Sequence, residues 1–474
     1  MTEMIKADLC VIGAGSGGLS IAAGAAQMGA DVVLLERDKM GGDCLNYGCV
    51  PSKSLLAAGH AAHSVRTASR FGVRASEPDI DFKAVHDHVK GVIAAIEPHD
   101  SQERFEGLGV RVIREEGRFI GPRTVAAGDY EISAKRIIIA TGSAPVVPPI
   151  PGLSERPYFT NETIFDNDQP IGHLLVIGGG PIGLEMAQAH ARLGAKVTVF
   201  EGLKALGNDD PELADVVKER LAAEGVDIHE GALVKQIAGE AGALTLDVEI
   251  EGATRSFEGT HLLLAVGRRP NLDSLDLDVA GIETGPGGII VDARLRTSNK
   301  KVFAVGDAAE GYKFTHIAGY HAGIVIRNVL FRMPAKVDYR AVPWVTYTAP
   351  ELAQVGLTEQ AARDAHGDIT VLRASFAEND RARAEDETHG LLKVITNRKG
   401  VILGASMVGE NAGELIQSWC LPISKGLKIK DMAGLILPYP TLGEINKRAA
   451  GSYYTPSLFS DRTRRIVRFL LSFG

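Results

Sequence analysis

The feature that most constrains the fold is a local pattern that occurs twice in the sequence. In each copy an apolar run leads into a glycine-rich turn, a segment of small residues follows, and a second apolar run ends in a glutamate. Short apolar runs beside such turns are typical of buried strands, and the segments between them are typical of helices. The copies span residues 9–36, with the turn Gly13-Ala14-Gly15-Ser16-Gly17-Gly18, and residues 174–201, with the turn Gly178-Gly179-Gly180-Pro181-Ile182-Gly183.

The glycine spacing in each turn is the one that a strand, turn and helix need to bind a dinucleotide. The first two glycines let the backbone turn tightly and approach a pyrophosphate, the third lets the helix pack on the strand, and the helix N-terminus faces the phosphate charge. The terminal glutamate accepts a hydrogen bond from a ribose hydroxyl. The sequence therefore predicts an α/β fold with two Rossmann-like sites, formed by Gly13, Gly15, Gly18 and Glu36 and by Gly178, Gly180, Gly183 and Glu201.

Two dinucleotide sites in one chain predict two different dinucleotides, which we expect to be FAD and a nicotinamide coenzyme. The carboxylate of Glu201 would repel the 2′-phosphate of NADPH. The residues that follow it, Gly202-Leu203-Lys204-Ala205, include one lysine and no arginine. NADH is therefore the predicted coenzyme, and NADPH is the less favoured one.

The bulk composition defines the class of protein. A chain of 474 residues, 45% hydrophobic and 23% charged, is long enough for about three globular domains. Its net charge of -8 is spread along the chain without a basic stripe, so nucleic acid is not an expected partner. An apolar strand begins at Leu9, which leaves no room for a signal peptide, and no apolar run reaches the roughly 20 residues of a membrane span. We expect a cytoplasmic protein.

A cysteine pair lies just after the first copy, in the segment Gly41-Gly42-Asp43-Cys44-Leu45-Asn46-Tyr47-Gly48-Cys49-Val50-Pro51-Ser52-Lys53. Along an undistorted helix, residues five positions apart are separated by about 7.5 Å, which is beyond disulfide reach. A disulfide between Cys44 and Cys49 therefore needs a bent backbone, which Gly48 permits. A helix start and the charge of Lys53 both stabilise a thiolate, so the pair is predicted to be redox-active.

Zinc binding and independent burial are the alternative interpretations of these cysteines. A structural zinc site needs two more nearby ligands, whereas Cys10 and Cys420 are isolated in apolar segments. Four cysteines in a chain of this length do not form a structural disulfide framework. We therefore predict no metal site, and we interpret Cys10 and Cys420 as core residues.

Taken in order, these motifs resemble one protein family. The two glycine turns, the segment from Gly41 to Lys53, the run Val302-Phe303-Ala304-Val305-Gly306-Asp307 and a Pro-Thr segment near the C-terminus are similar to the pyridine nucleotide-disulfide oxidoreductases. That family includes dihydrolipoamide dehydrogenase, glutathione reductase and mercuric reductase. The resemblance covers nearly the whole chain.

The resemblance implies roles for residues at the cysteine pair. In the family, the cysteine matching Cys44 exchanges with the substrate, and the one matching Cys49 lies against the flavin and forms a charge-transfer contact. The residues matching Lys53 and Glu185 form an ion pair near the flavin. The alternative interpretation is that Lys53 and Glu185 are solvated charges on the protein surface.

The resemblance also implies FAD contacts and a domain layout. Residues 137–143 are similar to the strand and turn that close the family's FAD domain, and residues 267–271 to the turn that returns from the nicotinamide domain. The implied layout is an FAD domain at 1–150 and 273–340, a nicotinamide domain at 151–272, and an α+β interface domain at 341–474 that forms a homodimer. The cofactor contacts implied in this way are Gly42, Lys53, Gly117, Thr141, Gly142, Gly267 and Asp307.

The chain departs from the family at one place. The disulfide reductases have a His-Pro-Thr segment followed by a glutamate, and the histidine is their general acid and base. Here Tyr439 stands at the position of the histidine, and Glu444 remains. A tyrosine, with a pKa of about 10, is a poor proton acceptor at neutral pH. Tyr439 and Glu444 are kept as candidate catalytic residues.

Mercuric reductases likewise have a tyrosine at this position. They also deliver metal through a cysteine pair at the C-terminus, whereas this chain has no cysteine after Cys420. Two other histidines, His316 and His321, follow Asp307, and we interpret both as packing residues.

The C-terminal segment 461–471 has basic and apolar residues at helical spacing. Such a helix can lie on an anionic membrane surface. Packing within the homodimer is the favoured interpretation.

Together these features predict an FAD-dependent oxidoreductase that relays electrons from NADH through Cys44 and Cys49 to or from a small thiol or disulfide, as dihydrolipoamide dehydrogenase does. Reduction of a soft metal ion such as Hg(II) or Cu(II) is an alternative. A flavin oxidase with incidental cysteines and a redox-sensing flavoprotein without turnover are further alternatives.

Overall fold

The computed structural model of the protein describes residues 2–473, which form two compact units. The first unit contains the segments Met1–Gly202 and Gly231–Val337, and the second contains Leu203–Glu230 and Asp338–Gly474. The first holds both glycine turns and the cysteine pair. The division into three domains remains a prediction.

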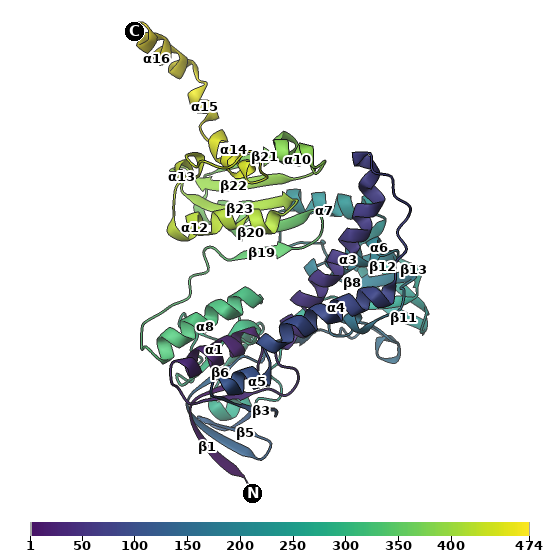
Figure 1. Ribbon diagram of the computed structural model, residues 1–474, viewed down its shortest axis with the longest axis vertical. Coiled ribbons are helices and arrows are strands. Elements are labelled where there is room, and N and C mark those ends of the chain that lie inside the picture. The colour runs from purple at the N-terminus through teal and green to yellow at the C-terminus, as the bar shows by residue number, and fades with distance from the viewer. Residues whose placement is uncertain (1, 474) are drawn as a thin grey trace. The chain divides into compact units, whose positions relative to one another are not determined.

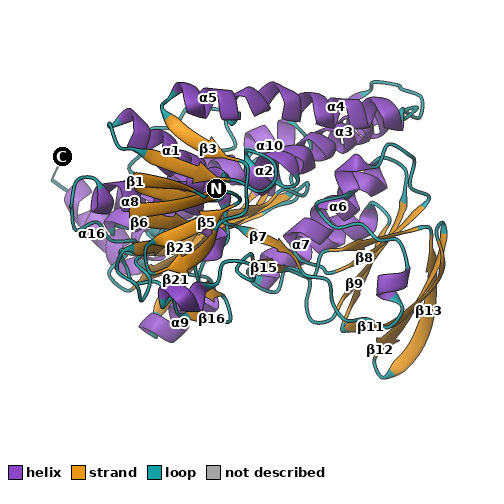
Figure 2. Ribbon diagram, turned by 90° about the horizontal axis from the view of Figure 1, so that it is seen from below, coloured by secondary structure: helices purple, strands orange, loops and turns teal. Residues whose placement is uncertain are grey.

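A mixed sheet forms the centre of the first unit, with the order β3-β2-β1-β6-β5-β4 and with β18 paired to β6 (Figure 2). Its β3, β2, β1, β6 and β18 strands run parallel, and β5 and β4 form an antiparallel edge. The strands are β1 (Glu3–Ile12), β2 (Val32–Leu35), β3 (Val110–Ile113), β4 (Arg118–Gly121), β5 (Thr124–Ala127), β6 (Tyr130–Ile139) and β18 (Val302–Ala304).

Both faces of this sheet are buried, as a parallel sheet requires. Along β1, Cys10 and Ile12 pack into one core, and Leu9 and Val11 pack into the core on the other face. Helices α1 (Ser16–Gln27) and α8 (Thr315–Val329) lie side by side against the second of these cores (Figure 1). The alternation along β1 confirms the prediction of a buried strand before the first glycine turn.

The second glycine turn lies in a smaller parallel arrangement, in which β8 (His173–Ile177) pairs with both β9 (Lys196–Glu201) and β14 (His261–Leu264). Helix α6 (Pro181–Arg192) follows β8 directly and packs on it and on β9. A three-stranded antiparallel sheet of β11 (Ala232–Glu240), β12 (Ala243–Ile250) and β13 (Ala253–Gly259) completes this part of the unit.

A long helix carries the second cysteine. Helix α3 (Cys49–Thr67) packs against α6 and against α4 (Phe82–Ile96). Residues 267–271 were expected to form the turn that returns from the nicotinamide domain. Part of this segment is instead a short strand, β15 (Arg268–Pro270), which pairs with β7 (Ser143–Pro145).

The second unit is built on an antiparallel sheet with the order β19-β20-β23-β22-β21. Its core surrounds the fully buried Trp419, whose indole N–H donates to Asn446 at 2.8 Å. The strands are β19 (Pro343–Thr346), β20 (Glu351–Gly356), β21 (Ile369–Ser375), β22 (Leu391–Asn397) and β23 (Ile402–Gly409). The helices include α7 (Pro211–Ala223), α9 (Glu359–His366), α10 (Asp380–Ala384), α12 (Gln417–Lys425), α14 (Glu444–Ser452), α15 (Thr455–Leu458) and α16 (Asp461–Leu471).

This architecture confirms the predicted class, an α/β chain with two Rossmann-like units and a C-terminal α+β part. No helix within residues 2–473 is both long enough and apolar enough to cross a membrane.

A buried ion pair joins α7 to the sheet of the second unit. The Lys393 ammonium, with a side chain only 4% exposed, donates to both carboxylate oxygens of Asp210 at 2.8 Å. Glu212 and Glu359 accept from the same ammonium at 2.7 and 3.2 Å. Arg373 reaches Glu212 from the solvent side, with 45% of its side chain exposed.

We expect Lys393→Ala to lower the free energy of unfolding of the second unit by about 3 kcal/mol, because it leaves a buried carboxylate without its ammonium partner. Both tryptophans of the chain, Trp344 and Trp419, lie in this unit, so urea unfolding followed by tryptophan fluorescence reports on it selectively. Arg373→Ala is the control and should cost less than about 1 kcal/mol. Equal losses in the two variants would contradict the burial argument.

Candidate functional site

The first glycine turn holds its backbone so tightly that side chains are excluded at two positions. Gly13 has a φ of +103°, and a Cβ placed there would lie 2.4 Å from the Ala140 carbonyl oxygen. A Cβ on Gly18 would lie 1.9 Å from the Gly13 carbonyl oxygen. The third glycine therefore lets α1 approach the end of β1, as the spacing predicts, and Gly15 is left at the N-cap of α1.

The second turn repeats this geometry. A Cβ on Gly178 would lie 2.4 Å from the Ala265 carbonyl oxygen, and one on Gly183 would lie 2.0 Å from the Gly178 carbonyl oxygen. Gly180 caps α6, and a Cβ there would meet no protein atom within 4 Å. The space beside Gly180 is therefore open for a ligand.

The terminal glutamates turn back toward their own glycine turns. One carboxylate oxygen of Glu36 accepts from the Ala14 backbone N–H at 2.6 Å, and one of Glu201 accepts from the Gly179 N–H at 2.7 Å. These bonds fix each carboxylate beside its turn, where a ribose hydroxyl would lie.

A pocket of about 60 Å³ lies beside the first turn. Gly13, Glu36, Gly117 and Thr141 line it together with Asn271. The Thr141 hydroxyl is buried without a hydrogen-bond partner among the described residues. An unsatisfied buried hydroxyl next to a glycine turn fits a site whose polar ligand satisfies it.

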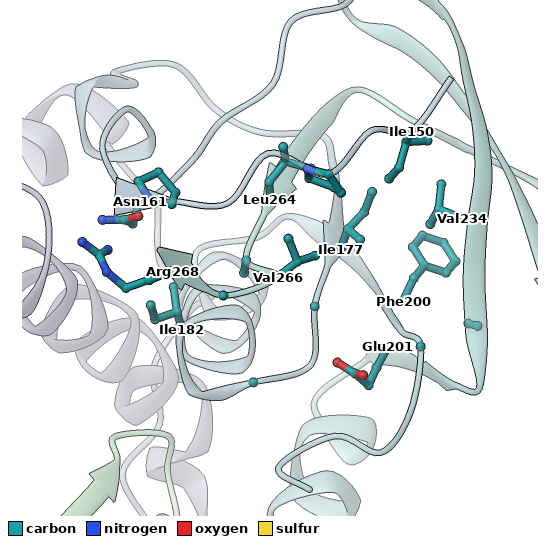
Figure 3. Close-up of a pocket in the computed structure, with 18 of the residues that line it drawn as sticks. Ile150, Asn161, Ile177, Ile182, Phe200, Glu201, Val234, Leu264, Val266 and Arg268 are labelled. Carbon is teal, nitrogen blue, oxygen red and sulfur yellow. The ribbon is translucent and has the colours of Figure 1, made fainter. Parts of the chain in front are cut away.

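A larger pocket of about 480 Å³ opens beside the second turn. Figure 3 shows the Glu201 carboxylate on one side, Arg268 and Asn161 on the other, and an aliphatic wall between them. Gly178, Gly180 and Gly267 belong to its lining. A volume of this size, apolar with a few polar groups, is typical of a small-molecule site.

The cysteine pair lies across a break between two helices. Cys44 is in α2 (Gly42–Asn46), Cys49 is the first residue of α3, and Gly48 between them has φ -124° and ψ -106°. The chain therefore does not continue as one helix, which is what a contact between the two sulfurs requires. Both residues are thiols in this structure.

The two thiols differ in acidity. The Cys44 thiol donates to the Cys49 sulfur, which lowers the pKa of Cys49 to about 6 and raises that of Cys44. The Thr315 hydroxyl, 3.3 Å from the Cys49 sulfur, and the charge of Lys53 lower the pKa of Cys49 further. Cys49 is therefore the thiolate of the pair at neutral pH.

A charged pair lies one helical turn beyond the cysteines. The Lys53 ammonium on α3 donates to the Glu185 carboxylate on α6 at 2.8 Å, and the Glu185 side chain is only 6% exposed. The structure thus brings together two residues that only the family resemblance had associated.

A polar network that the sequence analysis missed surrounds this region. Arg268 donates to the Asp43 carboxylate at 2.9 Å and to the Ser143 hydroxyl at 2.9 Å, and Ser143 donates to Asp307 at 2.6 Å. Asn161 donates to the same Asp43 oxygen at 3.1 Å. The network connects the residue before Cys44 to Asp307. The sequence analysis had predicted only that Arg268 is part of the turn at residues 267–271.

Tyr439 and Glu444 lie in the second unit, where they do not bond to one another in any interaction that the structure records. The Tyr439 hydroxyl donates to Asp380 at 3.0 Å, and this carboxylate raises the pKa of Tyr439. Glu444 instead accepts from the Thr441 backbone N–H at 3.4 Å. Asp380 is thus the acidic partner of Tyr439, and the sequence analysis missed it.

Asn379 holds the two segments of this pair together. Its side chain accepts from the Ala382 N–H at the start of α10 and donates to the Thr441 carbonyl at 3.1 Å. Asp380 is therefore placed beside Tyr439 by a capping residue that is itself buried.

The structure also places the other two cysteines and the two histidines that follow Asp307. Cys10 is fully buried in β1, and Cys420 is half-buried against the core of the second unit. His321 is buried and accepts from the Gly306 backbone N–H at 3.1 Å, and burial lowers its pKa to about 4. His316 is exposed and stacks on Phe314.

Comparison with known proteins decides the family. Residues 7–322 match the family described as pyridine nucleotide-disulphide oxidoreductase, and residues 342–450 match the dimerisation domain of that family. The chain belongs to this family. It is an oxidoreductase with a dimerisation domain, as the resemblance predicted.

Individual relatives within the family have different activities. The chain is 36% identical to dihydrolipoyl dehydrogenase of Geobacillus stearothermophilus and 34% identical to mercuric reductase of Streptomyces lividans, and each alignment covers 94% of this chain and 96% of the relative. Among solved structures it is similar to the Cu(II) complex of the HOCl-induced flavoprotein disulfide reductase RclA from Escherichia coli. That match has a TM-score of 0.84 and 30% identity, and covers 93% of this chain and 98% of the other.

Membership of this flavoprotein disulfide reductase family implies FAD and a nicotinamide coenzyme. The residues that line the two pockets are of the kinds that would hold parts of these groups. The one at Glu36 has a glycine cradle and the unsatisfied Thr141 hydroxyl, and the one at Glu201 has an open glycine turn at a helix N-terminus.

We expect Gly180→Ala to weaken NADH binding at least tenfold without lowering the melting temperature, because its Cβ meets no protein atom but occupies the space beside the helix N-terminus. Gly183→Ala should lower the melting temperature, since its Cβ would collide with the Gly178 carbonyl. Gly107→Ala, at another open position, is the control. Fluorescence titration with NADH and thermal unfolding measure both effects. Unchanged NADH binding in Gly180→Ala would place the coenzyme elsewhere.

Proposed function

We propose that this protein is an NADH-dependent reductase that passes electrons through Cys44 and Cys49 to a thiophilic acceptor. The observation that carries this proposal is the asymmetric cysteine pair, in which the Cys44 thiol donates to a Cys49 thiolate across a helix break. FAD, when bound, supplies the conversion between a hydride and the two electrons that open a disulfide.

NADH is favoured over NADPH at the larger pocket. Glu201 places a negative charge where the adenine ribose of a dinucleotide is bound in such folds, and it would repel a 2′-phosphate. The nearest cation along the chain, Lys204, is already bonded to Glu230 at 2.8 Å. No arginine follows Glu201 in the next residues.

Each cysteine has a separate task in this proposal. Cys49 is held as a thiolate by Cys44, Thr315 and Lys53, and Glu185 in turn holds Lys53. Cys44 loses its proton as it bonds to the acceptor, and the Cys49 thiolate then attacks the Cys44 sulfur, which releases the reduced acceptor and forms the disulfide. The reduced pair, one thiol and one thiolate, thereby loses two electrons and one proton to regenerate the disulfide.

The acceptor is a soft metal ion rather than lipoamide in the form we favour. Oxidation of dihydrolipoamide requires a base for the protons of this substrate, and a tyrosine whose pKa is raised by Asp380 is a poor one. For a metal the balance is simple: the thiol and thiolate become a disulfide, one proton is released, and the metal takes two electrons, one each for two Cu(II) or both for one Hg(II). Soft metal ions bind thiolates, so the cysteine pair itself can bind such an ion and no general base is needed for this step.

A thiol or disulfide substrate, as in dihydrolipoyl dehydrogenase, is the second candidate. It is supported by the alignment of nearly the whole chain with that relative. In this candidate the Tyr439 hydroxyl donates a hydrogen bond to the leaving sulfur in place of the bond that Asp380 accepts from it, and Glu444 positions the Thr441 backbone. The homodimer that brings these groups to the partner's cysteines is an expectation from the family.

Acceptor assays separate the two candidates. We expect NADH oxidation with Cu(II) or with Hg(II) thiol complexes to be at least tenfold faster than with lipoamide, and to be lost in Cys44→Ser. We expect dihydrolipoamide and NAD to give almost no NADH until Tyr439→His supplies a base, since a positioned base contributes about 10² to 10⁴ in rate. Tyr439→Phe is the matched control and should gain nothing. Fast NADH formation by the unmodified protein would instead establish the dihydrolipoamide reaction.

A further inference from the structure

The C-terminal helix α16 is exposed along its whole length. None of its described residues is buried, and Figure 1 shows it as the last element of the second unit, beyond α14 and α15. Ser460 caps its N-terminus by accepting from the Thr463 N–H at 3.2 Å. The helix is therefore well formed although it contributes no buried side chain to its unit.

The apolar residues of this helix gather on one face. Ile466, Phe469 and Leu470 are spaced i, i+3 and i+4, which is the spacing of an apolar stripe on a helix, and Phe473, two residues beyond the end of α16, continues this spacing. Their exposed fractions are 48%, 62%, 61% and 73%. The rings of Phe469 and Phe473 are in edge contact, with centroids 4.8 Å apart, which places them together on this face.

The opposite face is basic. Arg464 and Arg468 are four residues apart, and Arg465 lies beside them at the border with Phe469. Counting Arg462, the helix has four arginines and one aspartate, Asp461, in a chain whose net charge is -8. Positive charge is therefore concentrated here on a protein that is acidic as a whole.

Helix α16 also lies outside the part of the chain that the family explains. The dimerisation domain of the family matches residues 342–450 and ends before α15 and α16. The helix is therefore additional to the domain that pairs the subunits.

We propose that α16 binds the surface of an anionic lipid membrane, with its apolar face in the interface and its arginines at the headgroups. Long basic side chains at the border of an apolar face reach back to headgroups while the apolar residues are buried. Each such cation near an anionic membrane adds attraction, which salt weakens. The inference is independent of which acceptor the enzyme reduces. It places a reductase at the membrane surface, where a membrane-bound source of its acceptor would be close.

The charge pattern favours lipid over a second copy of the chain. A contact between two copies of α16 would place its arginines near one another, and like charges repel. An anionic membrane instead offers many negative groups to the arginines that flank the apolar face. Association between copies through this helix is therefore the alternative that the experiment has to exclude.

Vesicle flotation with the purified full-length holoenzyme tests the proposal. We expect at least tenfold more protein bound to vesicles of phosphatidylcholine with phosphatidylglycerol than to phosphatidylcholine alone, and less binding at high salt. Leu470→Glu should abolish binding, and the double variant Arg464→Glu, Arg465→Glu should reduce it at least tenfold. Phe331→Glu, which changes an equally exposed apolar residue outside α16, is the control and should bind normally.

The mass of the protein in solution, measured by light scattering, distinguishes membrane binding by α16 from association between copies of the chain through α16. We expect Leu470→Glu to leave both the mass and the NADH-dependent turnover without vesicles unchanged. A smaller mass in Leu470→Glu would show that α16 joins copies of the chain and would overturn the proposal. Absence of vesicle binding, equal binding to neutral vesicles, or binding that survives both variants would also overturn it.

Discussion

The close approach of a helix to a strand at each glycine turn is the contact on which the rest of the first unit depends. At Gly18 and again at Gly183, any side chain would collide with the carbonyl oxygen of the first glycine of the turn. Since that space is closed, each helix begins directly at the end of its strand and points its N-terminus outward. The glutamate at the end of the next strand is then bonded to the same turn. One backbone arrangement, used twice, thus creates two neighbouring places for a pyrophosphate.

The cysteine pair depends on a different constraint, a helix that is interrupted. Gly48 separates α2 from α3, so that a thiol on the first helix can donate to a sulfur at the start of the second. The asymmetry that follows makes Cys49 the thiolate, and in the proposed function Cys44 is the residue that meets the acceptor. Arg268 and Asn161 hold Asp43, the residue before Cys44, and so tie the pair to the strand ends that carry Ser143 and Asp307. One polar network therefore connects the segment that carries the cysteine pair with residues that line the larger pocket.

Much of this was predictable from sequence, because the glycine turns and the cysteine segment are local patterns. Strand and helix types followed from apolar runs, and the family followed from the order of motifs. The contacts missed were between residues far apart in the chain: Arg268 with Asp43, Thr315 with Cys49, and Asp380 with Tyr439. Each joins an ordinary polar residue to a distant segment, and neither spacing nor composition carries that information. The pairing of Lys53 with Glu185 was expected only because relatives have it.

The central claim is that electrons pass through this thiol pair, and anaerobic titration with NADH tests it most directly. After two electrons we expect a long-wavelength charge-transfer band, because in the proposed arrangement the Cys49 thiolate lies against the flavin. A pKa of Cys49 lowered to about 6 means that the thiolate persists above this pH and is protonated below it. The band should therefore fade as the pH falls through about 6, and Cys49→Ser should not show it. Bleaching of the flavin at neutral pH with no such band would contradict the account.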